Sequence, residues 1–555
     1  MTLPPGDQLP LGRTPVVALS PDGSQLVYVA NHGGIRQLFR RLIDRFEATP
    51  IPGTEGAESP FFSPDGQSVG FFAEGKLKKV SLSGGAPLTL CSSPSNRGAS
   101  WGPDHTILFT PTLTVSDVFL VSDSGGTPQS LISPDRNKGE YSFRWPQFLP
   151  GGKAALFTIW TSTRFDDARI GLVSLKTGER RVLIEGGAYA RYVPSGHLVY
   201  ARSGGLLAVP FDLARLQVTG PPVSILEDVS MNPTTGASEF SSSADGTLAY
   251  VPGGWSVAES TLVWVDRKGA VEPLPAPPRG YATPRLSPDG QRLAVAIEGT
   301  NPGVWVYELA RGTLTEVAPS VLVPSPIWTP DGKRLTLRFR GDQSWPIYSM
   351  PADGSGTRER LTTVEGFQVP GSWSPDGQVL AFTEQDLKTG WDIWALSLDG
   401  KRNERPLLQT PANEGGPVFS PDGHWLAYQS DESGRDEVYV RPFLGSGGKW
   451  QVSTDGGTEP VWARNGRELF YRSGDKMMAV AIETKPAFVA AKPKLLFEGH
   501  YELGNYAFLQ NYDVSPDGQR FLMVKAGEQA TAAAQISVVL NWSEELQRRV
   551  PTGMK

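Results

Sequence analysis

The side chains with most scope for chemistry recur at one place in a repeated pattern, shortly before a turn of the type Ser-Pro-Asp-Gly. They are Glu58, Arg97, Arg144, Tyr189 and Glu239 in the first half of the chain, and Thr283, Ser325, Glu414, Glu459 and Asn511 in the second. Arg97 and Arg144 have the same offset in neighbouring repeats, so together they could bind an anionic group. The simpler interpretation is that they form ion pairs with Glu58 or Glu239.

The repeated turn aspartates suggest calcium binding or acid/base chemistry as a second possibility. They are Asp22, Asp65, Asp289, Asp331, Asp376, Asp422 and Asp517. An aspartate in a turn can bond to its own backbone, which explains the position without any ligand. Copies in separate repeats also could not converge on one reacting atom, so we interpret them as structural.

Other chemical motifs are missing from the sequence. There is no Gly-x-Ser-x-Gly elbow, and no Gly-Lys pair is followed by Ser or Thr as a P-loop requires. The five histidines are far apart in sequence, and His105, His197 and His424, on or after turns, are expected to be exposed. The single cysteine, Cys91, is interpreted as a small packed residue. We therefore predict no catalytic residue, no metal and no cofactor.

The elements that position these residues can be inferred from length and composition. The chain has 555 residues, which predicts at least two domains. Its 62 glycines and 48 prolines suit short strands and tight turns. A formal charge of −6 argues against nucleic-acid binding. No apolar run is long enough to span a membrane, and the start at Met1 shows no secretory signal, which would place the chain in the cytoplasm.

The turn sequence repeats twelve times, strictly or loosely, at intervals of 39 to 52 residues. Each interval holds four short strand-like runs, which is typical of a β-propeller blade. The residue before the turn is aromatic in eight repeats, and we expect the ring to pack against the next blade. These residues are Phe62, Trp101, Phe148, Tyr192, Trp328, Trp373, Phe419 and Trp462.

Twelve blades exceed the usual size of one ring, so we predict an all-β fold of two tandem six-bladed propellers. The proline-rich segment 272–279 suggests domains of residues 1–278 and 279–555, with the boundary somewhere in 252–280. The sequence does not decide where three further strands belong. The strand 261–266 could open the second ring, and 536–540 could close one of the rings. A strand near 3–11 could fill a gap in the twelfth repeat.

The repeat resembles the WD40-like PD repeat of TolB-type propellers. The segments Leu3-Pro4-Pro5-Gly6 and 17–23, Gly75 to Val80, and the ending Val538 to Leu546 are more narrowly similar to the C-terminal propeller region of bacterial serine/threonine kinases, as in acidobacteria. That resemblance implies a sensing or interaction role outside the cytoplasm, linked to a kinase upstream. The chain itself has no His-Arg-Asp, no Asp-Phe-Gly and no kinase glycine-rich loop, so kinase activity is not carried over.

The leading functional hypothesis is a non-catalytic propeller that binds a protein, peptide or glycan through its loops and channel mouths. Its candidate ligand-binding residues are Glu58, Arg97, Arg144, Tyr189, Glu239, Glu414 and Glu459. One alternative is a hydrolase or lyase that uses Glu58, Arg97, Arg144 and Glu239 at a channel mouth. Another is a periplasmic assembly partner in the manner of TolB.

Overall fold

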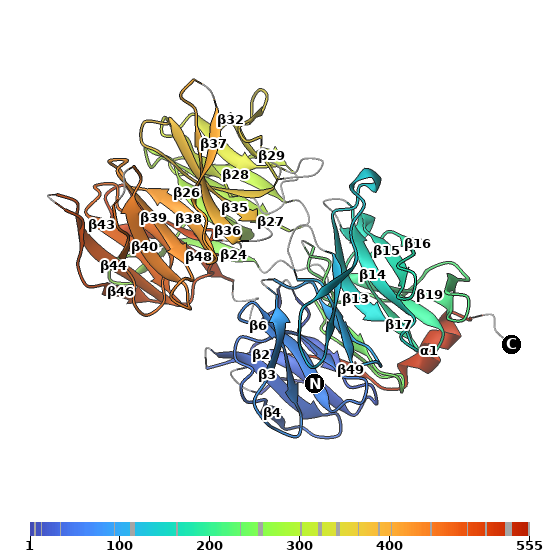
Figure 1. Ribbon diagram of the computed structural model, residues 1–555. Coiled ribbons are helices and arrows are strands. Elements are labelled where there is room, and N and C mark those ends of the chain that lie inside the picture. Colours follow the sequence, from blue (N-terminus) through green and yellow to red (C-terminus); the bar gives the residue numbers. More distant parts are fainter. Residues whose placement is uncertain are drawn as a thin grey trace. The chain divides into compact units, whose positions relative to one another are not determined.

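The computed structural model shows an all-β protein built from many antiparallel sheets, as expected of tandem β-propellers (Figure 1). It describes all residues except 5–6, 13, 34, 94, 112–116, 162–164, 234, 254–258, 300–301, 320–324, 340–344, 364–365, 387–388, 401, 445–446, 486, 505–507, 528–534 and 553–555. The described strands form twelve sheets, in two compact units. The first unit comprises residues 1–256 and 531–555, and the second comprises residues 257–530.

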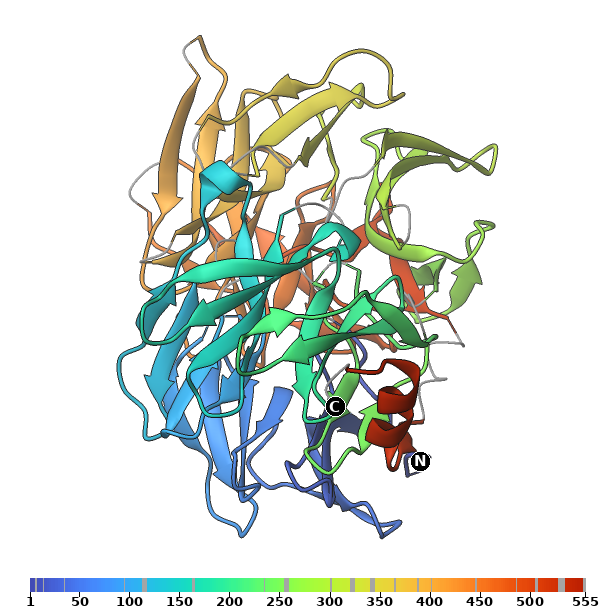
Figure 2. The ribbon, with the colours of Figure 1, turned by 90° about the vertical axis from the view of Figure 1, so that its right-hand side faces the viewer.

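The first unit contains six of the sheets, coloured blue to green in Figure 2 except for one strand near the C-terminus, which is red. Three are β1 (Val17–Leu19), β2 (Gln25–His32), β3 (Ile35–Leu42), β4 (Ala48–Pro50); β5 (Glu58–Phe62), β6 (Ser68–Ala73), β7 (Lys76–Ser81), β8 (Leu88–Ser92); and β9 (Ala99–Trp101), β10 (Thr106–Phe109), β11 (Val118–Ser122), β12 (Gln129–Ile132). The others are β13 (Ser142–Phe148), β14 (Ala154–Trp160), β15 (Arg169–Ser174), β16 (Arg180–Glu185); β17 (Ala188–Val193), β18 (His197–Arg202), β19 (Gly205–Asp212), β20 (Gln217–Val218), β21 (Val223–Leu226); and β22 (Phe240–Ser242), β23 (Leu248–Tyr250), β49 (Ser537–Val539). Two short 3₁₀ helices (Arg136–Lys138 and Phe165–Asp167) and one α-helix, α1 (Trp542–Arg549), complete this unit.

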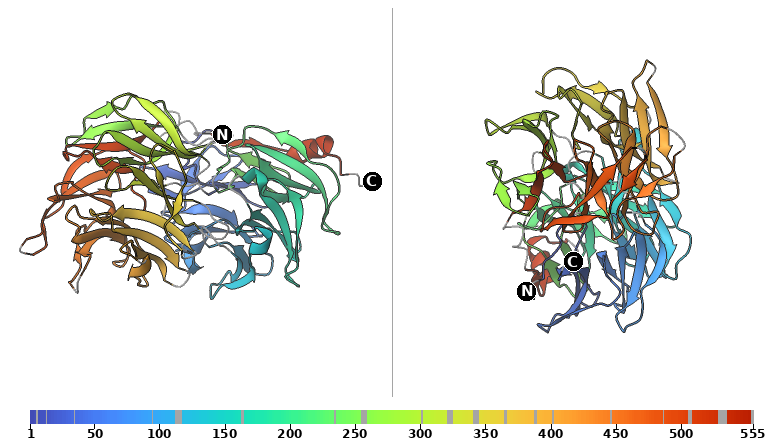
Figure 3. Two further views of the ribbon diagram at one scale, coloured as in Figure 1. Left: turned by 90° about the horizontal axis from the view of Figure 1, so that it is seen from above. Right: turned by 90° about the vertical axis from the view of Figure 1, so that its left-hand side faces the viewer.

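The second unit contains the other six sheets, of which Figure 3 gives two further views. Three are β24 (Ser260–Asp266), β25 (Val271–Pro273), β47 (Tyr512–Val514), β48 (Arg520–Ala526); β26 (Gly280–Leu286), β27 (Arg292–Glu298), β28 (Gly303–Glu308), β29 (Thr313–Pro319); and β30 (Ile327–Trp328), β31 (Arg334–Arg338), β32 (Ile347–Pro351), β33 (Glu359–Arg360). The others are β34 (Phe367–Trp373), β35 (Val379–Asp386), β36 (Gly390–Ser397), β37 (Asn403–Leu408); β38 (Glu414–Phe419), β39 (Trp425–Ser430), β40 (Glu437–Pro442), β41 (Trp450–Gln451); and β42 (Thr458–Trp462), β43 (Glu468–Ser473), β44 (Lys476–Glu483), β45 (Val489–Ala490), β46 (Lys494–Glu498).

The first strands of successive sheets contact one another in turn and close a ring in each unit. In the first unit β1, β5, β9, β13 and β17 are neighbours in that order, Tyr189 of β17 stacks edge-on against Phe240 of β22, and β22 returns to β1. In the second unit the order is β26, β30, β34, β38 and β42. The Tyr512 hydroxyl of β47 donates to the Glu459 carbonyl of β42, and β47 contacts β26. These inner strands define a mouth end, where they begin, and a turn end, where the repeated turns lie.

Each ring is completed by a strand from a distant part of the sequence. Strand β24, at the start of the second unit, pairs along its length with β48, whereas β49 pairs with β23 of the first unit. The second unit is therefore inserted in the chain between β23 and β49. A border at residue 278 would put β24 and β25 in the first unit, and the pairing of β24 with β48 is what puts them in the second. The N-terminus bridges Thr2 to Gln535, next to β49, rather than filling the twelfth repeat.

The repeated turns stack on one another around each ring. In the turn of Asp22, the Ser20 hydroxyl and the backbone N–H of Ser24 both donate to its carboxylate. The equivalent hydroxyl bonds occur at Asp65, Asp289, Asp331, Asp376, Asp422 and Asp517. In several repeats the turn glycine has a φ near +70° and lies against the turn proline of the preceding sheet, as Gly332 does against Pro288 and Gly423 against Pro375. The proline therefore also serves as a contact between sheets.

The aromatic residues before the turns also join neighbouring sheets. The indole N–H groups of Trp328, Trp373 and Trp462 donate to Arg285, Thr336 and Val418 of the preceding sheet, at 2.8 to 3.1 Å. The predicted packing role fits this arrangement, but the direction was wrong: these rings contact the preceding blade and not the next one. No helix among the residues described here is long and apolar enough to cross a membrane.

The glycine–proline contact gives a matched test of what joins the sheets. Gly290 and Gly518 both have a φ of +70°, but a Cβ at Gly290 would lie 2.6 Å from Pro516, whereas a Cβ at Gly518 would meet nothing within 4 Å. We expect Gly518→Ala to cost about 1–2 kcal/mol of unfolding free energy for the left-handed backbone. Gly290→Ala should cost about 1–3 kcal/mol more, because it overpacks the contact.

Denaturant unfolding of the two variants measures this difference. The double variant Gly290→Ala/Pro516→Ala is compared with the single variant Pro516→Ala. In this background the glycine substitution should lose most of its extra cost in unfolding free energy, because the overpacked proline ring is gone. Equal destabilisation by the two glycine substitutions would show that the contact between turns does not stabilise the ring.

Candidate functional site

The inner strands carry a β-bulge near the mouth end of both units. Their pairing register shifts between Arg144 and Gln147, between Ala188 and Arg191, and at equivalent places in other sheets. At these bulges several non-glycine residues have positive φ, namely Ser59, Trp145, Tyr189, Thr283 and Glu459. A bulge turns side chains away from the regular alternation of a strand. The predicted candidates Tyr189, Thr283 and Glu459 therefore owe their orientation to this local backbone.

The neighbouring sheet supplies hydrogen-bond acceptors for the backbone N–H groups at the bulges. The Trp145 N–H donates to the Arg97 carbonyl at 2.6 Å, and the Tyr189 N–H donates to the Thr158 hydroxyl at 3.0 Å. In the second unit the Thr283 N–H donates to Asn511 Oδ1 at 2.7 Å. The candidates at the mouth thus take part in holding successive sheets together.

The two predicted arginines of the first unit, Arg97 and Arg144, are buried, and each donates to neutral groups. Arg97 Nη1 donates to the Asn96 carbonyl, and Arg144 donates to the Ser142 hydroxyl and the Thr235 carbonyl. The Arg144 guanidinium also stacks over the Trp160 ring, with its carbon 4.3 Å from the ring centroid. Neighbouring sheets therefore bring the two arginines near one another, through the bond from Trp145 to Arg97.

The acids of the first unit have partners of their own. Glu58, which is partly exposed, forms an ion pair with Arg36 at 2.9 Å and accepts a bond from Asn96. Glu239 is buried and accepts the backbone N–H of Val16 at 2.7 Å. Burial raises the pKa of Glu239 to about 8, although the Val16 bond opposes this shift. Burial also raises the pKa of the Tyr189 hydroxyl.

The two predicted acids of the second unit, Glu459 and Glu414, have different surroundings. Glu459 accepts the backbone N–H groups of Gly504 and Asn511, at 2.8 and 2.7 Å, and burial raises its pKa. Glu414, at the start of β38, accepts the hydroxyl of Thr410, and burial raises its pKa to about 6. Ser325 is buried as well. Glu459 thus links strands at the ring closure, whereas Glu414 lies among other carboxylates.

Two buried acids beside Glu414 were missed by the sequence analysis, which considered only inner strands. Glu384 and Asp392 lie on β35 and β36 and face each other directly across the pair. Burial raises the pKa of Glu384 to about 7, and neighbouring carboxylates add to the effect. The acidic strand end Glu384-Gln385-Asp386 was the available signal in the sequence.

The turn aspartates lie at the other end of the rings, away from these groups. Hydroxyl and backbone hydrogen bonds lower the pKa of Asp22, Asp65, Asp289, Asp331, Asp376 and Asp517. For Asp422 burial opposes the shift, and its pKa is still lowered. Within the part of the chain that the structure describes, no three His, Cys, Asp or Glu residues are grouped so as to hold a metal ion.

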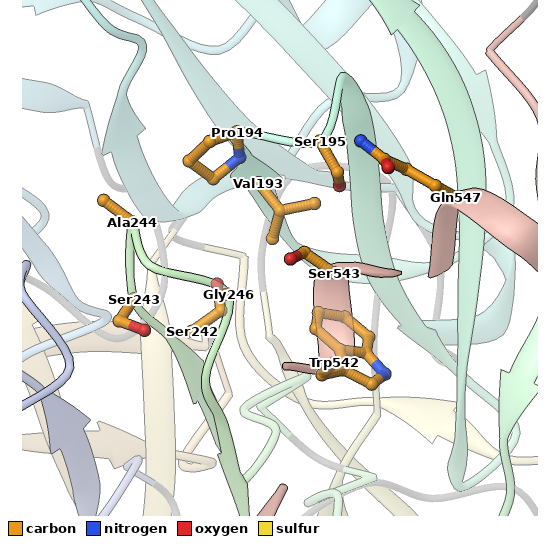
Figure 4. A pocket seen from close by; sticks show the side chains of 10 residues that line it. All are labelled: Val193, Pro194, Ser195, Ser242, Ser243, Ala244, Gly246, Trp542, Ser543 and Gln547. Carbon is orange, nitrogen blue, oxygen red and sulfur yellow. The ribbon is translucent and has the colours of Figure 1, made fainter. Parts of the chain in front are cut away.

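A pocket at the turn end of the first unit is lined by α1 and two turns (Figure 4). Ser543 and Gln547 of the helix lie beside Ser195 of one turn, and Val193 of β17 and Gly246 of the other turn also line the pocket. Next to it His197, expected to be exposed, is fully buried: Nε2 lies 2.6 Å from the Val550 carbonyl, and Nδ1 lies 3.0 Å from the Ser195 hydroxyl. The C-terminal segment covers this histidine, which its position after a turn did not reveal.

Comparison with known proteins supports the propeller assignment. The family model described as PD40, TolB beta propeller domain, matches residues 261–386. The uncharacterized protein Atu1656 of Agrobacterium fabrum is 31% identical over 204 residues, which cover 34% of this chain and 67% of that protein. A TolB homolog of Chlorobium luteolum is 37% identical over 102 residues, 18% of this chain and 23% of that protein. The match thus spans less than a quarter of the TolB homolog.

Among solved structures, a TolB-type protein from Agrobacterium tumefaciens aligns with a TM-score of 0.40 at 19% identity. The alignment covers 49% of this chain and 99% of that one.

The raised pKa of Glu239 predicts how stability depends on pH. In the unfolded chain this carboxyl titrates near its ordinary value of 4.5, and in the folded chain near 8. Between these values unfolding releases a proton, so the Glu239 contribution to stability falls as pH rises, by up to about 1.4 kcal/mol per pH unit. The neutral variant Glu239→Gln lacks this contribution.

Unfolding free energies of both proteins across that pH range test the assignment. The difference between variant and parent should grow in favour of the variant as pH rises from about 5 to 8, because every other group titrates in both proteins. Parallel curves would mean that Glu239 is ionised in the folded chain.

Proposed function

Because the chain belongs to the same family as Atu1656 and carries TolB-type β-propeller repeats, we propose that it is a non-catalytic binding protein. Its ligand is a protein, a peptide or a glycan, held by loops and channel mouths. The fold supplies a rigid frame for such a site and does not name the ligand.

The main support for this proposal is that the acidic side chains at the mouth end already bond to groups within the chain. A hydrolase or lyase needs an acid or base that can exchange a proton with substrate. Glu239 and Glu459 instead accept backbone N–H groups that join one segment to another. Glu58 has Arg36 as its partner. These bonds support a binding role over the alternative of a channel-mouth hydrolase or lyase built on Glu58, Arg97, Arg144 and Glu239.

A finer proposal concerns what the binding is for. We propose that the chain senses its ligand outside the cytoplasm, as in the kinase-linked propellers that its end segments resemble. A kinase domain and a membrane span in the same reading frame upstream would support this role. The match to a TolB homolog favours a second candidate, an assembly partner that binds another protein.

The binding role predicts that ligands are held and returned unchanged. We expect members of a peptide and glycan panel to bind the full chain reversibly in biolayer interferometry, and mass spectrometry to recover them intact. Glu459→Gln should keep the affinity as long as the ring stays folded, because this side chain bonds to backbone within the unit. A bound ligand that is cleaved or otherwise converted would contradict the proposal.

A further inference from the structure

Three buried carboxylates gather at the mouth end of the second unit. We call Glu384, Asp392 and Glu414 the acid cluster. Glu384 and Asp392 are 7% and 0% exposed and lie directly opposite each other on β35 and β36, an arrangement in which like charges repel. Glu414, 2% exposed, begins the neighbouring sheet, and the Asp392 charge contributes to the raised pKa of Glu414 after burial itself.

The hydrogen bonds of the cluster leave two oxygen atoms open. Asp392 Oδ2 accepts the Thr389 hydroxyl at 2.6 Å and the Gln409 amide at 3.2 Å, and Glu414 Oε1 accepts the Thr410 hydroxyl. The other oxygen of each carboxylate, Asp392 Oδ1 and Glu414 Oε2, is buried and has no hydrogen-bond partner among the residues described. No ion pair within 4 Å reaches the cluster from those residues either.

The same unit shows how a buried acid is normally compensated. Glu437, at the start of β40, is fully buried and forms an ion pair with Arg435 at 2.8 Å. It also accepts the Ser453 hydroxyl and the backbone N–H of Gly456. A buried charge without such partners is costly. The acid cluster therefore has the chemistry of a site that is completed by a cation from outside the chain.

The surroundings favour an organic cation over a metal ion. The described acids are not grouped tightly enough to hold a metal. The aromatic rings nearby do not belong to the cluster: Trp391 alternates with Asp392 along the strand and lies on the opposite face, 5.6 Å from the ring of Phe367, which the Arg338 guanidinium already covers. A guanidinium group suits the two open oxygens because it presents several N–H donors in a plane.

We propose that Asp392 and Glu414 bind the guanidinium group of an arginine in a peptide or protein ligand. The inference rests on the proposed binding function and names the chemistry of its ligand. The exposed side chain of Gln409 makes the long bond to Asp392, and a guanidinium donor can replace its amide there. The ligand then supplies the donors that the two open oxygens lack.

The smallest probe that tests this proposal is N-acetyl-arginine methylamide. We expect it to bind the full chain at millimolar concentration in saturation-transfer NMR, at least about tenfold more tightly than its neutral citrulline counterpart. Asp392→Asn and Glu414→Gln should each weaken arginine binding about tenfold, the change expected when one charge-assisted hydrogen bond is lost. Glu468→Gln is the matched control, because this carboxylate of the second unit already has an arginine partner, Arg267, and it should leave the affinity unchanged.

The stability of the Asp392→Asn variant distinguishes a ligand-binding role of Asp392 from a role in supporting the fold. Removing one of two facing carboxylates relieves repulsion, so Asp392→Asn should raise the unfolding midpoint of the ligand-free chain. A lowered midpoint would indicate that the carboxylate supports the fold and would overturn the assignment.

The remaining outcomes distinguish this inference from the proposed function. The arginine site would be overturned if the arginine probe fails to bind, if the citrulline probe binds as tightly, or if the two variants bind the arginine probe as tightly as the parent chain. In any of these cases, reversible binding of another peptide or glycan would leave the binding role intact. An arginine peptide that binds through Asp392 but is cleaved would keep the site and contradict the non-catalytic role.

Discussion

The structure depends on satisfying backbone groups where one sheet meets the next around a closed ring. A buried N–H without a partner is costly, and each bulged inner strand presents such a group. The neighbouring sheet supplies an acceptor in several places, as Thr158 does for Tyr189 and Thr383 does for Gly416. Farther along the same strands, the Phe419 N–H donates to the Ser372 hydroxyl. This requirement, more than any chemistry on a ligand, explains the polar residues of the inner strands.

Ring closure follows the same logic over longer distances in sequence. The sheet of β47 and β48 takes its third strand from β24, and the sheet of β22 and β23 takes its third strand from β49. Both pairings put an early segment beside a late one, so neither ring depends on a free edge strand, which would otherwise invite association. The second unit consequently has its own start and end within one sheet, and it interrupts the chain of the first without interrupting its ring.

The sequence predicts local features of this fold well because they depend on a few adjacent residues. The turns follow from proline, aspartate and glycine in order, and the four-strand period follows from the spacing of those turns. The partners of β24 and β49 could be posed only as alternatives, since pairing between segments hundreds of residues apart leaves no local signal. The acid cluster was missed for a related reason: Glu384 and Asp392 become neighbours only through the register of β35 and β36. His197 was misjudged because the segment that covers it comes from the far end of the chain.

Buried acids that have hydrogen-bond donors within the chain serve the fold of this protein, whereas buried acids with open oxygens point to a ligand. Glu239, Glu459 and Glu437 are all buried, and each has backbone or arginine donors within the chain. Their burial serves the ring, because the bonds they accept join segments that must stay together. The acid cluster differs: its repulsion across β35 and β36 opposes folding, and two of its oxygens are left open. A ring held together by the bonds between sheets described above can tolerate such a cost at one place, and a cation from a ligand is the simplest group that offsets it.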